Sequence, residues 1–315
     1  MKKQVIALAL FCCCLIGYAK DKRPFDYRFH KNDTINILKV EENDSTKKTT
    51  KYQIIVLEAK GSKAVLKFDA VSHNFDADSV TNSKIANFMP NPDQFMEKIK
   101  SMSLSPIIQY ENGKPKSMVN FKEVKTSTSA MFDEFFNALS KRTENVPDSL
   151  KEQREKMDSI MPMIKRLIKP MIEEFMTEEL IMSQYSDMVQ HDLPQKLGKW
   201  SETKGGATAQ CSLTATQNAG EYEYQEKAKT ELSGDELKDP QLKDNPAIET
   251  FTEMGAFGKL ALAFMDSLSI ESTTNGVIYS NGIPKHFVKE LRTSFSMMGQ
   301  KKDSTKKVTI SVIDK

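Results

Sequence analysis

The sequence has few of the residues that build metal centres or disulfide bonds. Among its 315 residues there are only four Cys and four His. The histidines are far apart, and none has a partner at the spacing of a metal-ligand pair. They are His30, His73, His191 and His286. Three of the cysteines lie within residues 12–14 of the apolar N-terminus, so only Cys211 is left for the fold. We therefore expect no metal, no cofactor, no intrachain disulfide and an inert, buried Cys211 thiol.

The common catalytic motifs are also missing. The sequence contains no G-x-S-x-G, no P-loop, no G-x-G-x-x-G and no H-E-x-x-H. Paired carboxylates such as Glu173-Glu174 and Glu178-Glu179 lie among Lys and Arg, a pattern typical of solvated helix faces. We expect a protein that is not an enzyme. A hydrolase that uses two of the 43 acidic residues is the alternative, although no pair stands out.

The only long apolar run is at the N-terminus. Val5–Ile16 follows Lys2 and Lys3 and precedes Gly17-Tyr18-Ala19. A basic start, a short apolar stretch and a small-x-small site are typical of a secretory signal peptide, cleaved here after Ala19. The run of about 12 residues is too short to cross a bilayer, and no later run reaches 18 apolar residues. The sequence therefore predicts a periplasmic or secreted protein without a transmembrane span.

A lipid-anchored protein is the alternative to simple secretion. A lipobox needs Leu and two small residues before the acylated Cys. The residues before Cys14 and before Cys12 do not fit that pattern. We therefore expect a cleaved signal peptide and no lipid anchor.

An excess of charge of one sign is absent as well. The 45 basic and 43 acidic residues give a formal charge of +2, and loss of Lys2 and Lys3 with the signal peptide leaves 43 of each. A neutral protein has no overall field to attract nucleic acid or an anionic membrane. We therefore expect no nucleic-acid partner.

What is present is a pattern of alternating strands and amphipathic helices. Period-two alternation predicts strands over residues 25–29, 34–40, 52–58, 64–71, 107–110 and 116–119, the last two joined by Asn112-Gly113. A second set follows Trp200, over residues 207–214, 222–228, 268–272, 277–279, 286–295 and 308–313. Helices are expected over residues 91–103, 127–139, 148–191 and 246–265, and loops over 41–51 and 235–245. The predicted class is α+β: antiparallel sheets, able to curve into a half-barrel, packed by helices.

One motif occurs twice. Residues 110–119 and 279–288 share the pattern Y-x-N-G-x-P-K-x-[MF]-V at an offset of 169 residues. The repetition predicts two related halves, although chance agreement of two hairpin turns is the alternative. The expected organisation is a signal peptide at 1–19, an N-terminal α+β half at 20–145, a Met-rich helical connector at 146–192 and a C-terminal α+β half at 193–315.

The connector has the most unusual composition of the chain. It carries seven of the 17 Met residues between positions 157 and 188, among Ile, Leu and Phe. Methionine fills irregular cores, and it also lines adaptable apolar grooves. Helices packed on a sheet would explain the pattern, and so would a groove for an apolar ligand or a partner helix. The candidate ligand-binding residues are Met161, Met163, Ile164, Met171, Phe175 and Met176.

A second enriched pattern concerns modification. Seven of the 19 Asp residues are followed by Ser or Thr and then by Ala, Ile, Leu, Val, Met or Thr. This pattern resembles the acceptor motif of general protein O-glycosylation in one group of Gram-negative gut and oral bacteria. Helix capping by Asp and Ser is the alternative explanation. The candidate acceptors are Thr34, Ser45, Ser79, Ser267 and Ser304.

The layout resembles an uncharacterised family of exported proteins from those bacteria. The resemblance rests on the signal peptide, on Phe25–Asp33 as an early aromatic strand and on Thr274–Pro284 as a late strand hairpin. These motifs specify strands and turns, so no functional residue carries over. At the level of fold, curved antiparallel sheets backed by helices are similar to periplasmic lipoprotein carriers.

These observations together favour a non-enzymatic exported binding protein. Its partner would be an apolar small molecule, a lipid or an envelope protein, held between a concave sheet and the Met-rich helices. A structural or assembly protein of the cell envelope is the alternative. Oligomeric state has no signature in the sequence.

Overall fold

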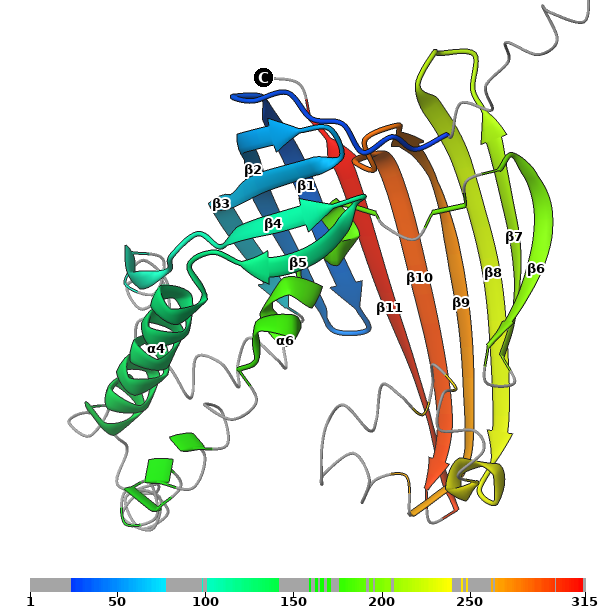
Figure 1. Ribbon diagram of the computed structural model, residues 1–315. Coiled ribbons are helices and arrows are strands. Elements are labelled where there is room, and N and C mark those ends of the chain that lie inside the picture. Colours follow the sequence, from blue (N-terminus) through cyan, green and yellow to red (C-terminus); the bar gives the residue numbers. More distant parts are fainter. Residues whose placement is uncertain are drawn as a thin grey trace, which may run out of the picture.

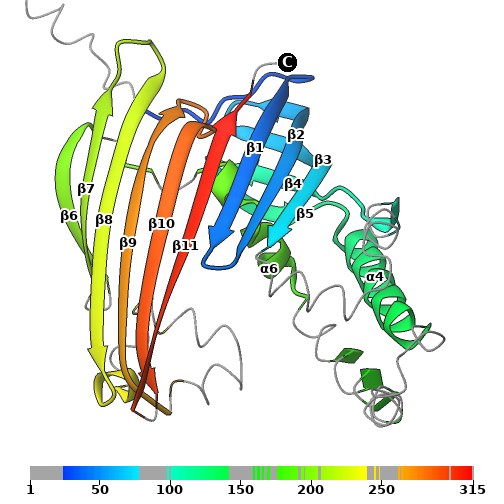
Figure 2. The ribbon, with the colours of Figure 1, turned by 180° about the vertical axis from the view of Figure 1, so that it is seen from behind.

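The computed structural model describes residues 24–77, 101–141, 176–190, 196–204, 207–239, 264–297 and 299–313, together with isolated residues between these ranges. Its main feature is one antiparallel sheet of 11 strands in the order β5-β4-β3-β2-β1-β11-β10-β9-β8-β7-β6. Figures 1 and 2 show that the sheet is strongly twisted, so that β4 and β5 run across the direction of β8, β9 and β10. All other described elements lie around this sheet.

The first five strands form a meander at one end of the sheet. They are β1 (Thr34–Asn43), β2 (Thr46–Lys60), β3 (Lys63–Ala77), β4 (Ile107–Glu111) and β5 (Lys114–Met118). Gly61 turns the chain between β2 and β3 with φ 64°. Asn112 and Gly113 turn it between β4 and β5 with φ 53° and 76°, the two positive values that a type I′ hairpin requires. The hairpin predicted at Asn112-Gly113 is confirmed.

The remaining strands form the taller end of the sheet. They are β6 (Gly198–Lys204), β7 (Ala207–Ala215), β8 (Glu221–Ser233), β9 (Met265–Tyr279), β10 (Pro284–Met297) and β11 (Gln300–Val312). From β7 to β11 each strand pairs with the strand before it in the chain, so this end is also a meander, and β6 is its edge strand. Residues 268–272 and 277–279, predicted as two strands, belong to the single strand β9.

The predicted α+β class with two helix-packed halves is wrong, because the protein is mainly β and its strands form a single sheet. The last strand, β11, pairs with the first, β1, from Ile37 opposite Val312 to Asn43 opposite Lys306. This ladder joins the two meanders and leaves no boundary between separate sheets. Alternation in the sequence reveals most of the strands, although not β6, but it carries no information on which strands far apart in the chain will pair.

The two faces of the sheet differ sharply. Residues directly opposite each other in an antiparallel ladder share a face, so the register identifies one continuous face across all strands. We call it the inner face; it is defined by Ile37, Ile54, Leu66, Leu213 and Ile310, all with 0% exposure. The other, outer face carries polar and charged side chains, as along β8, where Glu223, Gln225, Lys227, Lys229 and Glu231 are all exposed. One apolar and one solvated face is the usual pattern for antiparallel sheets.

Helices make up a small part of the described chain. The predicted helix at 127–139 is confirmed within α4 (Phe121–Lys141), and α6 (Glu178–Ser183) is a short helix near β5 (Figure 1). Single 3₁₀ turns occur at η3 (Ser186–Met188) and η4 (Glu236–Lys238). No helix within the described ranges is long and apolar enough to cross a membrane. Most of the predicted helices at 91–103 and 246–265, most of the predicted helix at 148–191 before residue 176, and the signal peptide at 1–19 lie outside the described residues. Residues 176–190 form only α6 and η3, not the continuous helix predicted there.

Two local predictions are wrong for physical reasons. Residues 25–29 alternate as a strand would, and Phe25, Tyr27 and Phe29 are indeed buried, yet the segment is not in the sheet and Tyr27 has φ 52°. Residues 41–51, predicted as a loop, extend β1 and β2 to a tight turn at Asp44-Ser45. Cross-strand ion pairs replace apolar contacts there, with Lys47 2.7 Å from Glu42 and Lys48 3.7 Å from Glu41.

Candidate functional site

The inner face carries two separate apolar clusters. The larger cluster lies over β1–β5 and the adjoining ends of β7–β11, and it includes Ile37, Leu66, Ile108, Leu213 and Phe287. The smaller cluster lies at the opposite end of β8–β10 and is built from Leu232, Leu237, Ile248, Leu262, Met265 and Leu268, with Ile270 and Phe295 packed against it. Both clusters lie on the same face of the same strands, because the β8–β9 register runs without a shift from Tyr222 to Leu232.

The segment before β1 covers one end of the larger cluster. Figure 1 shows this dark-blue segment passing across the ends of β10 and β11. The backbone N–H groups of Asp26 and Tyr27 both donate to the carbonyl of Ser280, at 2.9 and 3.1 Å. The Tyr27 ring then lies against both copies of the repeated turn, Gly113 and Gly282. The two Asn-Gly motifs therefore meet at one aromatic side chain, although they are 169 residues apart.

The C-terminal part of the predicted connector covers the other side of the larger cluster. Thr177 caps α6 by accepting from the Leu180 N–H at 3.2 Å, and the Glu178 carboxylate accepts from the backbone N–H of Met118 in β5. The inward side chains of this segment are buried. They are Met176, Ile181, Met182, Met188 and Val189. The last residue of this segment, Gln190, is hydrogen-bonded to the β9–β10 turn: its N–H donates to the Gly282 carbonyl at 2.8 Å.

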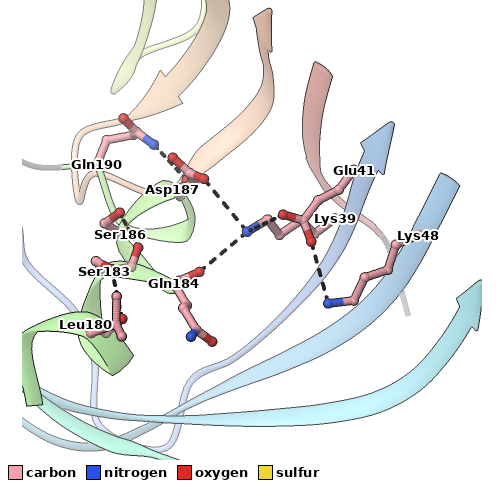
Figure 3. Close-up of polar contacts among 9 residues, drawn as sticks. All are labelled: Lys39, Glu41, Lys48, Leu180, Ser183, Gln184, Ser186, Asp187 and Gln190. Carbon is pink, nitrogen blue, oxygen red and sulfur yellow. Dashed lines mark hydrogen bonds and ion pairs between the residues drawn. The ribbon is translucent and has the colours of Figure 1, made fainter. Parts of the chain in front are cut away.

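A buried lysine joins this segment to β1. Lys39 is at an inner-face position, in phase with Ile35 and Ile37, and its side chain is only 8% exposed. Its ammonium lies 3.5 Å from Glu41 and 3.7 Å from Asp187, and it donates to the Gln184 carbonyl at 3.4 Å. Figure 3 shows these contacts, together with Lys48 on the far side of Glu41. A charge removed from water needs such partners, so Lys39 fixes the position of residues 184–187 on the sheet.

Three tyrosines belong to the larger cluster or pack on it: Tyr110 is buried within it, and Tyr52 and Tyr185 pack against it. Burial raises the pKa of Tyr52 to about 12, with a further contribution from the Glu41 charge, and burial also raises the pKa values of Tyr110 and Tyr185. Tyr52 meets Tyr185 edge-on, with ring centroids 6.2 Å apart. Within the part of the chain that the structure describes, the buried Tyr110 hydroxyl has no hydrogen-bond partner. All three phenols therefore stay protonated and uncharged at physiological pH.

Between the two clusters the inner face is more polar and more open. We call this the central zone; it is defined by Ala228 and Ser272, which oppose each other on β8 and β9, by Leu291 opposite Ser272 on β10, and by Lys289 and Lys306. Ala228, Ser272 and Leu291 are only partly buried, and Lys289 and Lys306 are exposed. The central zone is therefore an accessible part of an otherwise apolar face. Sequence reasoning missed it, although Lys289 and Lys306 alternate with apolar residues that face the same side of the sheet.

Cys211 lies at the border of the central zone, between Trp200 and Glu226 on the neighbouring strands. Burial, with Glu226 and Glu202 nearby, raises the pKa of its thiol to about 11. A thiol that stays protonated at neutral pH is a poor nucleophile. Among the residues that the structure describes, no three His, Cys, Asp or Glu side chains come together as a metal site.

The predicted methionine groove is described only in part. Met163 is 58% exposed, whereas Met176 is 7% exposed and packs inward. Met161, Ile164, Met171 and Phe175 lie outside the described residues. The structure thus gives opposite environments to the two candidates that it describes, and the groove stays a prediction.

The candidate modification sites differ in exposure. Ser45 is exposed in the β1–β2 turn, Ser304 is exposed on β11, and Ser267 is exposed near the start of β9. Thr34 is partly buried at the start of β1, and Ser79 lies outside the described residues. Two of the motifs are neighbours in space, because the Thr305 N–H donates to the Asp44 carboxylate at 3.3 Å.

The likenesses of the chain to solved structures are distant, and two of them cover most of its length. No family model and no curated protein matches the chain. Over 91% of its length, the chain is similar to a structure described as lipid-protein interactions in lipovitellin, with 8% identity and a TM-score of 0.42, and it spans 25% of that protein. It is also similar to a porin-like protein from Bacteroides uniformis, with 9% identity and a TM-score of 0.18 over 92% of this chain and 100% of that one. Neither likeness is close enough to assign a function.

Proposed function

We propose that the chain is a non-enzymatic, exported binding protein that takes an apolar or lipidated ligand, or an apolar segment of an envelope partner, on the inner face of its sheet. The observation that carries the proposal is the central zone. In this zone the apolar side chains of Ala228 and Leu291 remain partly accessible between two packed apolar clusters, which offers a ligand area from which water can be displaced. The packed clusters on either side hold the zone in shape.

The electrostatic features of the described residues support binding rather than catalysis. The described groups whose pKa values shift most are tyrosines and a cysteine, raised by burial, so they are uncharged at neutral pH. A catalytic site shifts pKa values toward the working pH instead. Export after cleavage at Ala19 fits a neutral protein with a single thiol outside the signal peptide.

The proposal is tested with two neighbouring substitutions on opposite faces of β9. Ser272→Glu places a carboxylate in the central zone, between Ala228 and Leu291. Thr273→Glu places the same charge on the outer face, between Lys227 and Glu290. Delipidated mature protein is titrated with a fluorescent hydrophobic probe such as 1-N-phenylnaphthylamine. We expect probe binding by the wild type and by Thr273→Glu, and clearly weaker binding by Ser272→Glu.

Two further measurements separate the alternatives. Native mass spectrometry of protein purified from its own cell envelope is expected to show an added ligand mass, and its intact mass to begin at Lys20. A protein that binds no probe, carries no ligand and forms concentration-dependent oligomers in sedimentation would instead be a structural component of the envelope.

A further inference from the structure

The charges of the protein are sorted between the two faces of the sheet. Along the β10–β11 ladder, three lysines point to the inner face: Lys289 opposite Val308, Lys306 opposite Leu291 and Lys302 opposite Phe295. Each therefore stands beside an apolar side chain. All three are exposed, and none forms an ion pair within the described residues.

On the outer face of β8–β11, in contrast, most of the cations have a carboxylate beside them. Arg292 lies 2.7 Å from Glu290, Lys301 lies 3.6 Å from Asp303, and Lys227 lies 3.2 Å from Glu271. Lys307 stands opposite Glu290 in the ladder. The net neutrality of the whole chain thus conceals a local excess of positive charge on the inner face.

No carboxylate on the neighbouring strands balances these lysines. The inner-face positions of β9 nearest to them, 268, 270, 272 and 274, are Leu, Ile, Ser and Thr. On one side the first inner-face carboxylate is Glu226 of β8, which accepts the Tyr224 hydroxyl at 2.7 Å. On the other side it is Glu41 of β1, which is already engaged by Lys39 and Lys48.

We infer that the ligand of the central zone is a lipid with an acidic headgroup, whose charge is held by Lys289 and Lys306 while its apolar chain lies along Leu291 and Ile270 toward the smaller cluster. This inference rests on the proposed function. Lysine stems can also cover apolar surface while their ammonium groups remain in water, with no ligand involved. The two explanations differ in whether the charge itself contributes to binding.

The headgroup is tested by ligands that share one chain and differ in charge. The mature full-length protein is titrated with dodecanoate, dodecanol and dodecyltrimethylammonium below their micellar concentrations, by displacement of the fluorescent probe. We expect dodecanoate to bind best and dodecyltrimethylammonium to bind worst. Because the lysines are exposed, the preference for dodecanoate should weaken as salt is raised.

The lysines are tested by substitutions that remove the same charge from each face. The Lys289→Gln/Lys306→Gln variant is expected to weaken dodecanoate binding about fivefold to tenfold, with little change for dodecanol. The control is Lys301→Gln/Lys307→Gln, which changes the net charge equally on the outer face and should bind as the wild type does. Thermal melts of both variants check that each is folded.

The outcomes separate this inference from the proposed function. If dodecanol and dodecanoate bind equally and neither double variant changes either affinity, the acidic-headgroup inference is wrong and the apolar binding function stands. If no ligand binds the wild type, the proposed function fails. If both double variants lose affinity for dodecanoate equally, the effect follows the net charge and the assignment to the inner face is wrong.

Discussion

Gly113 lies directly against the ring of Tyr27: a β-carbon at Gly113 would stand 2.3 Å from Cε1 of Tyr27. A β-carbon at Gly282 would stand 3.0 Å from the same atom. Glycine is therefore required in both copies of the repeated Asn-Gly turn, in addition to its positive φ: Tyr27 is the neighbour at Gly113, and at Gly282 the Gln190 carbonyl oxygen is nearer still, at 2.7 Å. The close approach explains how a segment outside the sheet holds the ends of two distant hairpins together.

Replacement of Gly113 by Ala is expected to destabilise the protein by more than a backbone effect alone. Gly61 is the matched control, because its φ of 64° is close to the 76° of Gly113 but nothing lies within 4 Å of its β-carbon position. Overpacking costs about 1–3 kcal/mol, so Gly113→Ala should lower the free energy of unfolding by that amount more than Gly61→Ala. Urea denaturation measures both. Equal losses for the two variants would show that Tyr27 does not occupy this position in solution.

Replacement of Lys39 by Met should loosen residues 176–190 from the sheet. Methionine keeps the apolar stem but leaves Asp187, 3.7 Å from the ammonium, without its cation. Removing one partner of a buried pair is strongly destabilising, but Glu41 and Asp187 are partly exposed and Glu41 retains Lys48. We therefore expect a loss of about 1–3 kcal/mol in the free energy of unfolding.

Hydrogen exchange provides the readout for Lys39. The Met188 N–H, which donates to the Tyr185 carbonyl at 3.0 Å, should exchange faster in Lys39→Met. The control is Lys47→Met, which breaks an exposed pair with Glu42 and should change stability by less than about 1 kcal/mol. If the Met188 amide is equally protected in Lys39→Met and the wild type, Lys39 does not hold the segment.

The sequence predicts the strands well because alternation is a local property. Residues 34–40, 52–58 and 64–71 all lie within strands, and Asn112-Gly113 forms the predicted hairpin. The single sheet was not predictable in this way. It depends on β11 pairing with β1, and that register is chosen by the combined apolar face of both strands rather than by either alone.

The candidate site was only partly predictable for a related reason. The composition of the connector points to the methionines as apolar ligand residues, yet Met176 is buried inside the fold. The central zone is instead built from residues on four strands, such as Ala228 and Lys306, that meet only after the sheet has formed. Lys289 alternates with Phe287 and Leu291, so the sequence predicts that it faces the inner side once the strand is known.

Cys211 should react slowly with alkylating reagents at pH 8. Its pKa is raised from the ordinary value of 9.0 to about 11, so very little thiolate is present at that pH. A raised pKa in the folded state also means that the folded protein holds its proton more tightly than the unfolded chain. The contribution of Cys211 to stability is therefore full below pH 9 and is lost as the pH rises toward 11. Iodoacetamide labelling followed by mass spectrometry measures the rate against pH. Half-maximal labelling near pH 9 in folded protein would contradict the buried environment.

The Asp-Ser motifs are expected to be modified only where the fold exposes them. If modification takes place on folded protein in its native host, glycan mass should be found on Ser45, Ser267 and Ser304, which are exposed, and not on the partly buried Thr34. Site-resolved mass spectrometry of tryptic peptides tests this order. Ser45→Ala and Ser304→Ala each remove one acceptor while leaving Asp44 free to accept from the Thr305 N–H, so each should lose one glycan without a change in melting temperature. Equal occupancy of Thr34 and Ser45 would indicate modification before folding. Unmodified protein from the native host would leave helix and turn capping as the explanation of the Asp-Ser/Thr motifs.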